Sequence, residues 1–246
     1  MVNLLVTQAA LSGKPSQILH SKIISFSENM VLMESKLLQK LENKSITKKE
    51  LLEKVEDNSS LIPEILGGAS SSRPGVRYGC AKVLMDLSEE HPERLYPYMD
   101  FFTDLLDSKY RILTWSAIAI IANLTRVDKD NKFDAIFKKY YSLLNDEYMV
   151  TVANVVGHSS RIALAKPTLA QKIADELLKV ENISTTAHLT EECKKVIAEK
   201  AIGSFDLFFD RIEDKKKVIS FVRNYAKSAR KTLRMDAETF LKKWDR

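Results

Sequence analysis

The residue types that most often bind metals or act as nucleophiles are few and scattered in this sequence. Cys80 and Cys193 lie far apart, and neither has a second cysteine or a histidine at the spacing that metal sites use. The four histidines, at positions 20, 91, 158 and 188, are equally isolated from one another. We therefore expect no metal site and no disulfide framework.

Motifs for phosphate binding and for nucleophilic catalysis are also missing. None of the seven glycines forms Gly-x-Gly-x-x-Gly, Gly-x-x-x-x-Gly-Lys or Gly-x-Ser-x-Gly. Residues 67–75, rich in glycine and serine, are expected to form a flexible loop between helices. Acidic pairs are common, but none has a histidine or lysine placed to complete an acid–base dyad, so they favour helix caps or a solvated face. We expect no catalytic residues and no cofactor, and a protein that is not an enzyme.

Composition limits the elements that must position any site. The 246 residues include only 7 Gly and 6 Pro, whereas average usage would give roughly 17 and 12. An all-β chain needs frequent turns built on these residues, so that class is nearly excluded. No apolar stretch is long enough to span a bilayer, the first residues lack the basic region of a secretory signal, and we expect a cytoplasmic protein.

The spacing of apolar residues is helical almost throughout, with no sustained alternation that would predict a sheet. Phe26, Met30, Met33, Leu37 and Leu41 follow a 4-3-4-4 rhythm. Thr47 and Glu50 have the spacing of a capping box and predict the start of a helix that contains Leu51 and Val55.

An internal repeat of about 37 residues organises most of the chain. The segment that begins at Val76 matches the segment that begins at Leu113, and the same frame returns at Val150, Leu189 and Leu233. Each of these helices follows a shorter one, and the shorter helices are expected at residues 61–66, 99–106, 133–144, 169–180 and 218–226. The unit is therefore a helix–turn–helix hairpin used five times.

Two positions within the repeat are informative. Pro63, Pro97 and Pro167 fall early in three of the shorter helices, where a missing N–H costs little. Four residues after each frame start lies a small or nearly small side chain, which would let neighbouring helices approach closely. These positions are Cys80, Ala117, Asn154 (beside Ala153), Cys193 and Ala237. Both cysteines are accordingly expected to be buried structural thiols.

These features resemble the HEAT repeats of the armadillo-like helical class. The stretch from Pro97 to Asp107 resembles the first half of the motif, and Val76-Arg77 and Leu233-Arg234 resemble the opening of its second helix. The resemblance implies an all-α fold, a right-handed α-α superhelix of about five hairpins. We expect a tail and helical cap over residues 1–59 and one continuous repeat domain over 60–246. Its repeats would cover about 60–96, 97–131, 132–166, 167–206 and 207–246.

Two segments allow alternative interpretations. Residues 112–124 are apolar on almost every side, which favours a central buried helix, although an exposed groove for a partner remains the alternative, with Trp115 on either side. Residues 215–246 contain eleven Lys and Arg but three acidic residues. This basic end is either the polar face that a terminal repeat requires or a binding site for a polyanion. A turn near Ser228 would divide its stripe of cations between two helices.

The resemblance implies a non-catalytic scaffold that binds another protein on a curved surface built mainly from the second helices. Its candidate partner-binding residues are Arg77, Thr114, Trp115, Asn154, His158, Arg161, Lys194 and Arg234. For His158, a packing or solvated role is the competing interpretation. The alternative function is nucleic-acid binding through Arg223, Lys227, Arg230, Lys231 and Arg234. A DNA glycosylase of the alkylation-repeat type is a remote version of it, because no catalytic aspartate can be matched here.

Overall fold

The computed structural model describes residues 35–245. The tail expected at the start of the chain, and Phe26, Met30 and Met33 of the first apolar rhythm, lie outside the described residues. The chain divides into two compact units, residues 1–84 and 85–246, and the boundary falls inside helix α5 (Pro74–Glu90). We call them unit 1 and unit 2 and describe each by itself.

Unit 1 contains short helices, namely α2 (Lys36–Glu42), α3 (Lys48–Asp57), the 3-10 turn η2 (Ser59–Leu61), α4 (Ile62–Ala69) and most of α5. The predicted capping box is confirmed: Thr47 N donates to Glu50 Oε2 at 2.8 Å, and Glu50 N donates to Thr47 Oγ1 at 3.2 Å. Leu51 and Val55 of α3 are fully buried.

Glycine allows the helices of unit 1 to pack closely. A Cβ atom added at Gly68 would lie 2.5 Å from Cys80 Sγ, and one added at Gly79 would lie 2.8 Å from Leu41 Cδ2. Neither position has room for a larger side chain. Cys80 itself is fully buried, as the sequence predicted.

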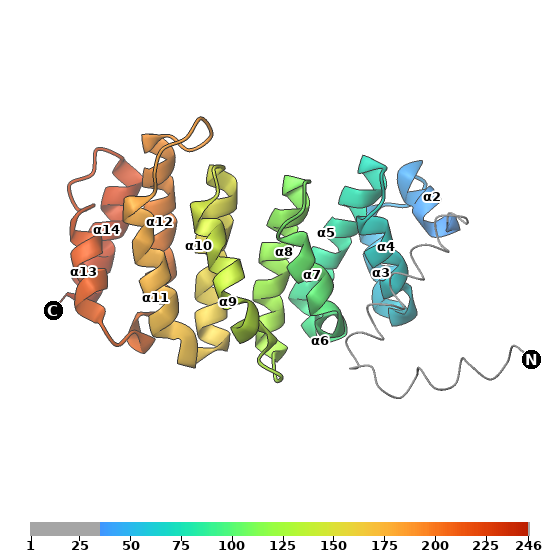
Figure 1. The fold of residues 1–246 in the computed structure, drawn as a ribbon, viewed down its shortest axis with the longest axis horizontal. Helices are drawn as coiled ribbons and strands as arrows, with labels where there is room; N and C mark the ends of the chain where they lie inside the picture. Colours follow the sequence, from blue (N-terminus) through green and yellow to red (C-terminus); the bar gives the residue numbers. More distant parts are fainter. Residues whose placement is uncertain (1–34, 246) are drawn as a thin grey trace, which may run out of the picture. The chain divides into compact units, whose positions relative to one another are not determined.

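Unit 2 is a row of helical hairpins (Figure 1). The first helices of the hairpins are α7 (Met99–Leu105), α9 (Lys132–Ser142), α11 (Ala170–Leu178) and α13 (Lys215–Arg223). The second helices are α8 (Arg111–Leu124), α10 (Met149–Ala165), α12 (Glu191–Phe208) and α14 (Lys231–Trp244). A short helix α6 (Pro92–Leu95) precedes them. The connecting 3-10 turns are η3 (Tyr96–Tyr98), η4 (Thr125–Val127), η5 (Leu143–Asn145), η6 (Pro167–Leu169), η7 (Lys179–Asn182) and η8 (Phe209–Arg211).

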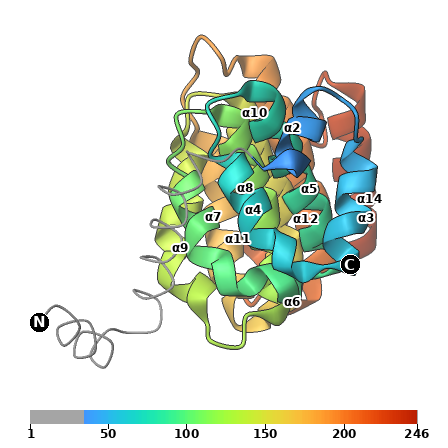
Figure 2. The same cartoon turned by 90° about the vertical axis from the view of Figure 1, so that its right-hand side faces the viewer.

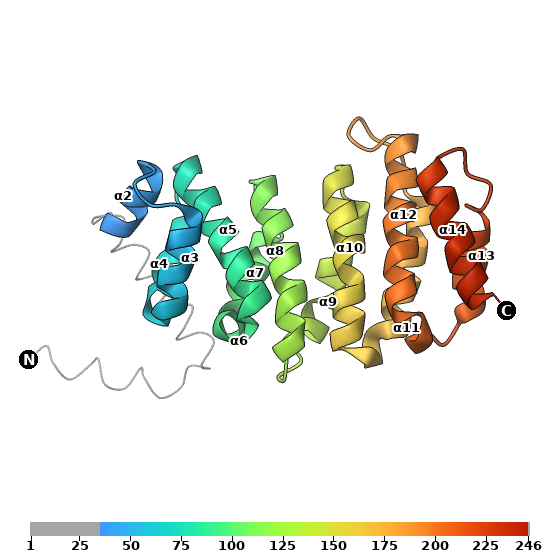
Figure 3. The same cartoon turned by 180° about the vertical axis from the view of Figure 1, so that it is seen from behind.

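The second helices of unit 2 form one layer. Helix α10 contacts both α8 and α12, and α12 contacts α14. Figure 3 shows α8, α10 and α12 side by side in front of the first helices, and Figure 2, viewed along the row, separates α9 and α11 from α12 and α14. Residues 35–245 contain no β-strand, and a single isolated bridge joins Thr186 to Leu189. The all-α prediction is confirmed.

The local signals of the sequence agree with these elements. Each of the three prolines lies in the first two positions of its element: Pro63 in α4, Pro97 in η3 and Pro167 in η6. Of the apolar stretch 112–124, every residue from Leu113 onward is buried except Trp115, whereas Ile112 is exposed. The buried interpretation of this helix is therefore confirmed for all of these residues except Ile112 and the half-buried Trp115.

The repeat register differs from the prediction in α10. The sequence frame matched Val150 with Leu113, but Leu113 is 2% exposed and Val150 is 43% exposed, the same value as Ile112. Val150 is thus the counterpart of Ile112, and the buried Thr151 takes the place of Leu113. The helices begin after N-cap residues Tyr110, Tyr148, Thr190 and Arg230.

This register also corrects the small-residue position. The seventh residue beyond each N-cap is fully buried, and these residues are Ala117, Val155, Ile197 and Ala237. Two of the four are large, so the packing does not require a small side chain in every repeat. Cys193 instead lies in the first turn of α12 and is half-buried, and the expectation that its thiol is buried was wrong.

Candidate partner-binding face

Exposed apolar side chains are confined to one layer of unit 2. Among the residues that the structure describes, the large apolar side chains with clear exposure are Ile112 of α8, Val150 and Leu164 of α10, Leu207 of α12 and Met235 of α14. All of them lie on second helices. We call the solvent-exposed side of α8, α10, α12 and α14 the second-helix face. Because these residues share one layer of helices, this face is the candidate interaction site of unit 2.

Helical spacing explains why these residues share a face. Val150, Gly157 and Leu164 are seven residues apart on α10 and therefore lie on one side of the helix. Gly203 and Leu207, four residues apart, do the same on α12. The other sides of both helices are needed for the core, where Val155, Val156 and Ile202 are buried. The sequence frame missed these positions because its register was one residue off in α10 and four residues off in α12, where Cys193 rather than Leu189 is the counterpart of Leu113.

At the start of α8 and α10, two predicted partner-binding residues make local contacts. The indole Nε1 of the half-buried Trp115 donates to Thr151 Oγ1 at 3.0 Å and joins α8 to α10. Asn154 Nδ2 donates to Val150 O, one turn earlier, at 2.8 Å. Both side chains lie beside the exposed Val150 and are partly accessible.

Further along the second-helix face, a polar network joins the end of α5 to α8 and α10. Asn123 Nδ2 donates to Ser88 Oγ at 2.8 Å, and Arg161 Nη1 donates to Asn123 Oδ1. Arg161 Nη2 also contacts Glu89 Oε1 at 3.3 Å. Asn123 is buried and was not among the predicted site residues. The sequence signal for it was a polar residue near the end of an otherwise apolar helix.

His158 is half-buried next to Arg161 and Gly157. The pKa of its imidazole is lowered to about 4, mainly by burial and in part by the nearby Arg161 and Lys200, while Glu89 acts in the opposite direction. The imidazole is therefore neutral near pH 7. It presents one N–H donor and one acceptor nitrogen to whatever lies against the second-helix face.

Three other predicted partner-binding residues contact the loop before their own helix. In unit 1, Arg77 is 3% exposed, and its Nη1 donates to Ser71 O at 2.8 Å and Ser72 O at 3.0 Å. In unit 2, Thr114 donates to Ser108 O at 3.4 Å and Arg234 donates to Ser228 O at 2.7 Å. The repeat position that resembles a recognition residue thus binds carbonyl groups six residues earlier. The remaining one, Lys194, pairs with Glu191 on the first turn of α12.

The predicted polyanion site is divided between elements. Helix α13 ends at Arg223 and α14 begins at Lys231, with Ser228 in the loop between them. Arg223 donates to Asp245 Oδ2 at 2.6 Å and Arg230 donates to Glu199 Oε2 at 2.9 Å. With Arg234 bound to a carbonyl, Lys227 and Lys231 are the exposed candidates.

The most strongly coupled buried charges of unit 2 lie away from this face, at the ends of the helices. Asp128, whose side chain is fully buried, accepts from Tyr96 Oη at 2.7 Å and from Lys166 Nζ at 2.8 Å. Lys132 N and Phe133 N donate to the same carboxylate. These bonds hold the pKa of Asp128 below its usual value against the opposing effect of burial.

The lysine of this cluster is satisfied as well. Lys166, at the end of α10, pairs with Asp134 at 2.5 Å and donates to Asn131 Oδ1 at 2.9 Å. Its pKa is raised by these partners although burial acts in the opposite direction. Every member of the cluster has partners, and Asp128 and Lys166 are buried. We therefore assign the cluster a structural role in joining the α7–α8 hairpin to the α9–α10 hairpin.

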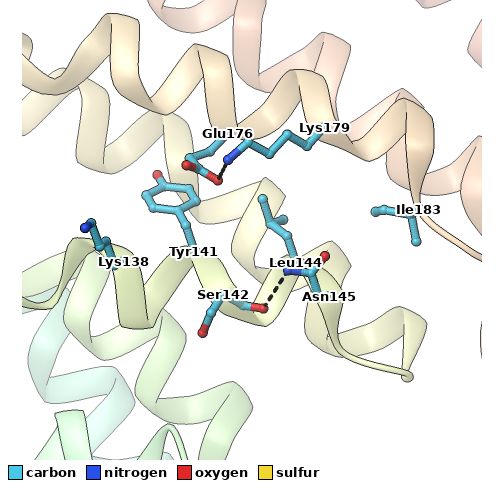
Figure 4. Close-up of a pocket in the computed structure, with 8 residues that line it drawn as sticks. All are labelled: Lys138, Tyr141, Ser142, Leu144, Asn145, Glu176, Lys179 and Ile183. Carbon is cyan, nitrogen blue, oxygen red and sulfur yellow. Dashed lines mark hydrogen bonds and ion pairs between the residues drawn. The ribbon is translucent and has the colours of Figure 1, made fainter.

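A small pocket lies between α9 and α11, on the first-helix side of unit 2 (Figure 4). It is lined by Lys138, Tyr141, Ser142, Leu144, Asn145, Glu176, Lys179 and Ile183. Lys179 pairs with Glu176 across its rim at 2.7 Å, and Tyr141 Oη donates inward to Ser159 Oγ at 3.1 Å. The lining has no nucleophile and base in contact, and residues 35–245 contain no group of side chains arranged to hold a metal ion.

In the described part of the chain, no helix is both long and apolar enough to cross a bilayer. Comparison with known proteins gave no matching family model and no matching curated protein.

The fold of this chain is similar to those of solved structures, among them three engineered proteins. A designed armadillo repeat protein is 18% identical over 83% of this chain and 90% of its own, with a TM-score of 0.57. A second designed armadillo repeat protein, solved in complex with the peptide (KR)4, is 14% identical over 95% of both chains, with a TM-score of 0.52. An engineered protein is 13% identical over 96% of this chain and 94% of its own, with a TM-score of 0.51. At such identities the likeness shows the fold alone.

Proposed function

Since this chain has an armadillo/HEAT-like helical repeat fold, we propose that it is a non-catalytic scaffold that binds a segment of another protein on its second-helix face. The observation that supports this most directly is the confinement of the exposed large apolar side chains to α8, α10, α12 and α14. A solvated repeat surface gains nothing from exposed leucines, whereas a binding surface buries them when its partner is present.

The distribution of polar residues supports the same proposal. Trp115, Asn154 and His158 lie among the exposed apolar residues and offer hydrogen-bonding groups beside them. Interfaces of intermediate strength combine an apolar centre with such polar groups. The designed repeat protein in complex with (KR)4 has the same fold and binds a peptide, which is the mode proposed here.

Site-specific crosslinking tests the proposal. A photoreactive amino acid at position 207 of the full chain should crosslink a partner in cells, and the same residue at position 135 should not. Ala135 is the matched control because it is exposed on α9, a first helix. The crosslinked partner, once purified, is titrated against the unmodified chain.

The titration is repeated with two matched variants. Leu207→Asp should weaken the affinity at least tenfold, because it places a charge where an apolar contact is expected. Ala135→Asp should leave the affinity unchanged. If position 207 crosslinks nothing, or if both variants weaken binding equally, the proposal fails.

A further inference from the structure

One part of the second-helix face combines apolar, basic and open positions, and the inference drawn from it rests on the proposed function. We define the Leu164–Leu207 patch as these two leucines with Gly157, Gly203, Lys200 and Arg211. Two hydrogen bonds hold the α12 side of the patch against α10: Ser204 Oγ donates to Val156 O at 2.7 Å and Arg211 Nη1 donates to Leu164 O at 2.7 Å. The first bond sets Gly203 of α12 beside Gly157 of α10.

The two glycines have no function inside the fold. Both are exposed within helices, and a Cβ added at either would meet no atom within 4 Å. Glycine in a helix interior is destabilising relative to alanine. In unit 1, the close contacts of Gly68 and Gly79 explain why glycine is present despite its cost in helix stability. No neighbour within the fold explains the glycines at positions 157 and 203. The main chain of a partner that passes directly over the helices would explain them.

Within residues 35–245, the patch contains two cations without an ion pair, whereas the neighbouring carboxylates Glu199 and Asp206 are paired with Arg230 and Lys243, and Asp210 is exposed beside Arg211. Arg161 is paired with Glu89. Lys200 and Arg211 have no carboxylate partner among the described residues, and Arg211 contacts only the carbonyls of Ala163 and Leu164. The nearby imidazole of His158 is available to donate a hydrogen bond. Leu207, at 61% the most exposed of the large apolar residues, and Leu164 at 42% lie beside these cations.

We propose that the Leu164–Leu207 patch binds an acidic, apolar segment of the partner protein. A large apolar side chain of the segment packs between Leu164 and Leu207, and the main chain runs over Gly157 and Gly203. Acidic side chains at two separate positions of the segment pair with Lys200 and with Arg211, which lie eleven residues apart. Charge complementarity of this kind selects partners and orients them.

Three fluorescein-labelled 12-residue peptides test the charge preference in anisotropy titrations with the full chain. They share the same leucine positions and carry glutamate, lysine or serine between them. The glutamate peptide should bind at least fivefold more tightly than the other two, and its affinity should fall as NaCl increases from 50 to 200 mM. Lys200→Glu should weaken the glutamate peptide about three- to tenfold, whereas Lys195→Glu, whose lysine pairs with Glu192 nearer the start of α12, should not.

The glycines provide a second readout that a purely structural role would not produce. Gly157→Ala and Gly203→Ala should each raise the melting temperature by about 2–4 °C and at the same time weaken the glutamate peptide at least threefold. Unchanged binding in both variants would overturn the close approach of the main chain.

The outcomes separate this inference from the proposed function. If the lysine peptide binds most tightly, or if no peptide binds up to 1 mM, the acidic segment is excluded, while crosslinking from position 207 still supports a protein-binding face. If all three peptides bind equally and Leu207→Asp weakens them all, the apolar contact is supported and the preference for acidic residues is contradicted.

Discussion

Asp128 and Lys166 show how much a single buried contact determines in this protein. Their carboxylate and ammonium groups are 2.8 Å apart, with exposures of 0% and 7% for the side chains. In sequence they are two ordinary charged residues, 38 positions apart. Removal of one partner from such a pair leaves the other charge buried without compensation, which is far more damaging than the loss of a surface pair.

Lys166→Ala should therefore lower the free energy of unfolding by about 3–5 kcal/mol. Urea denaturation measures the change. Lys179→Ala is the control because Lys179 pairs with Glu176 at the surface, and its loss should cost less than about 1 kcal/mol. Equal effects of the two variants would contradict the structural role of the Asp128 cluster.

The same cluster predicts a dependence on pH. The pKa of Asp128 is lower in the folded chain than its ordinary value of 3.8. Its contribution to stability is therefore complete above pH 3.8 and is lost as the pH falls below that value, because the unfolded chain then binds the proton more readily. Asp128→Asn should be less stable than the natural chain at pH 7, and the difference should shrink as the pH approaches 3.

Unfolding curves at several pH values for the natural chain and for Asp128→Asn measure this difference. Other carboxylates with lowered pKa, such as Glu199, titrate in both proteins and cancel in the comparison. A difference that stays constant from pH 7 to pH 3 would show that the carboxylate gains no proton-linked stabilisation from Lys166 and Tyr96.

At the scale of elements, the fourth residue of α5, α8 and α14 has a structural use. Arg77, Thr114 and Arg234 all contact carbonyls of the preceding loop. A loop between antiparallel helices has unpaired carbonyl groups, and a side chain from the following helix can satisfy them. The feature that resembled a recognition position therefore fixes the turn before α5, α8 and α14.

Arg77→Ala should lower the stability by about 1.5–3 kcal/mol, because it removes charge-assisted hydrogen bonds from a buried guanidinium to the carbonyls of Ser71 and Ser72. Chemical denaturation measures the loss, and Lys49→Ala, at an exposed position of α3, should change stability by less than about 0.5 kcal/mol. Hydrogen exchange should also become faster in residues 70–73 of the variant. If the variant is as stable as the natural chain, the hydrogen bonds of Arg77 do not stabilise the fold.

For the whole molecule, the open question in the sequence was the basic end. The excess of positive charge is concentrated in residues 215–246. Much of it is compensated by ion pairs within the fold, namely Arg223 with Asp245, Arg230 with Glu199 and Lys243 with Asp206. A polyanion site needs several cations that are free to release counterions. Division of the stripe between α13, a loop and α14 further reduces the density of charge.

We therefore expect no measurable binding of a 20-nucleotide single-stranded DNA at 150 mM NaCl. At 50 mM NaCl any binding should be weak and should depend little on individual residues. Fluorescence anisotropy at both salt concentrations measures this. Tight binding that is lost in Lys227→Glu together with Lys231→Glu would overturn the expectation and support the nucleic-acid alternative.

Some features of this protein follow from the sequence because they depend on local interactions. The helical spacing, the scarcity of Gly and Pro, the Thr47–Glu50 capping box and the positions of the prolines predicted an all-α chain of hairpins, and each acts within a few residues. Residues that are buried by periodicity, such as Leu113 and Ala117, could be predicted for the same reason.

The candidate site depended on distances that sequence spacing does not set. A loop one residue longer moved Val150 from the expected core to the surface, and Cys193 fell in a first turn rather than between helices. The partners of Asp128 and Arg161 come from other hairpins. Whether a leucine is buried or exposed depends on the helix packed beside it, so the second-helix face became visible only in the tertiary structure, whereas the repeat that builds it was already present in the sequence.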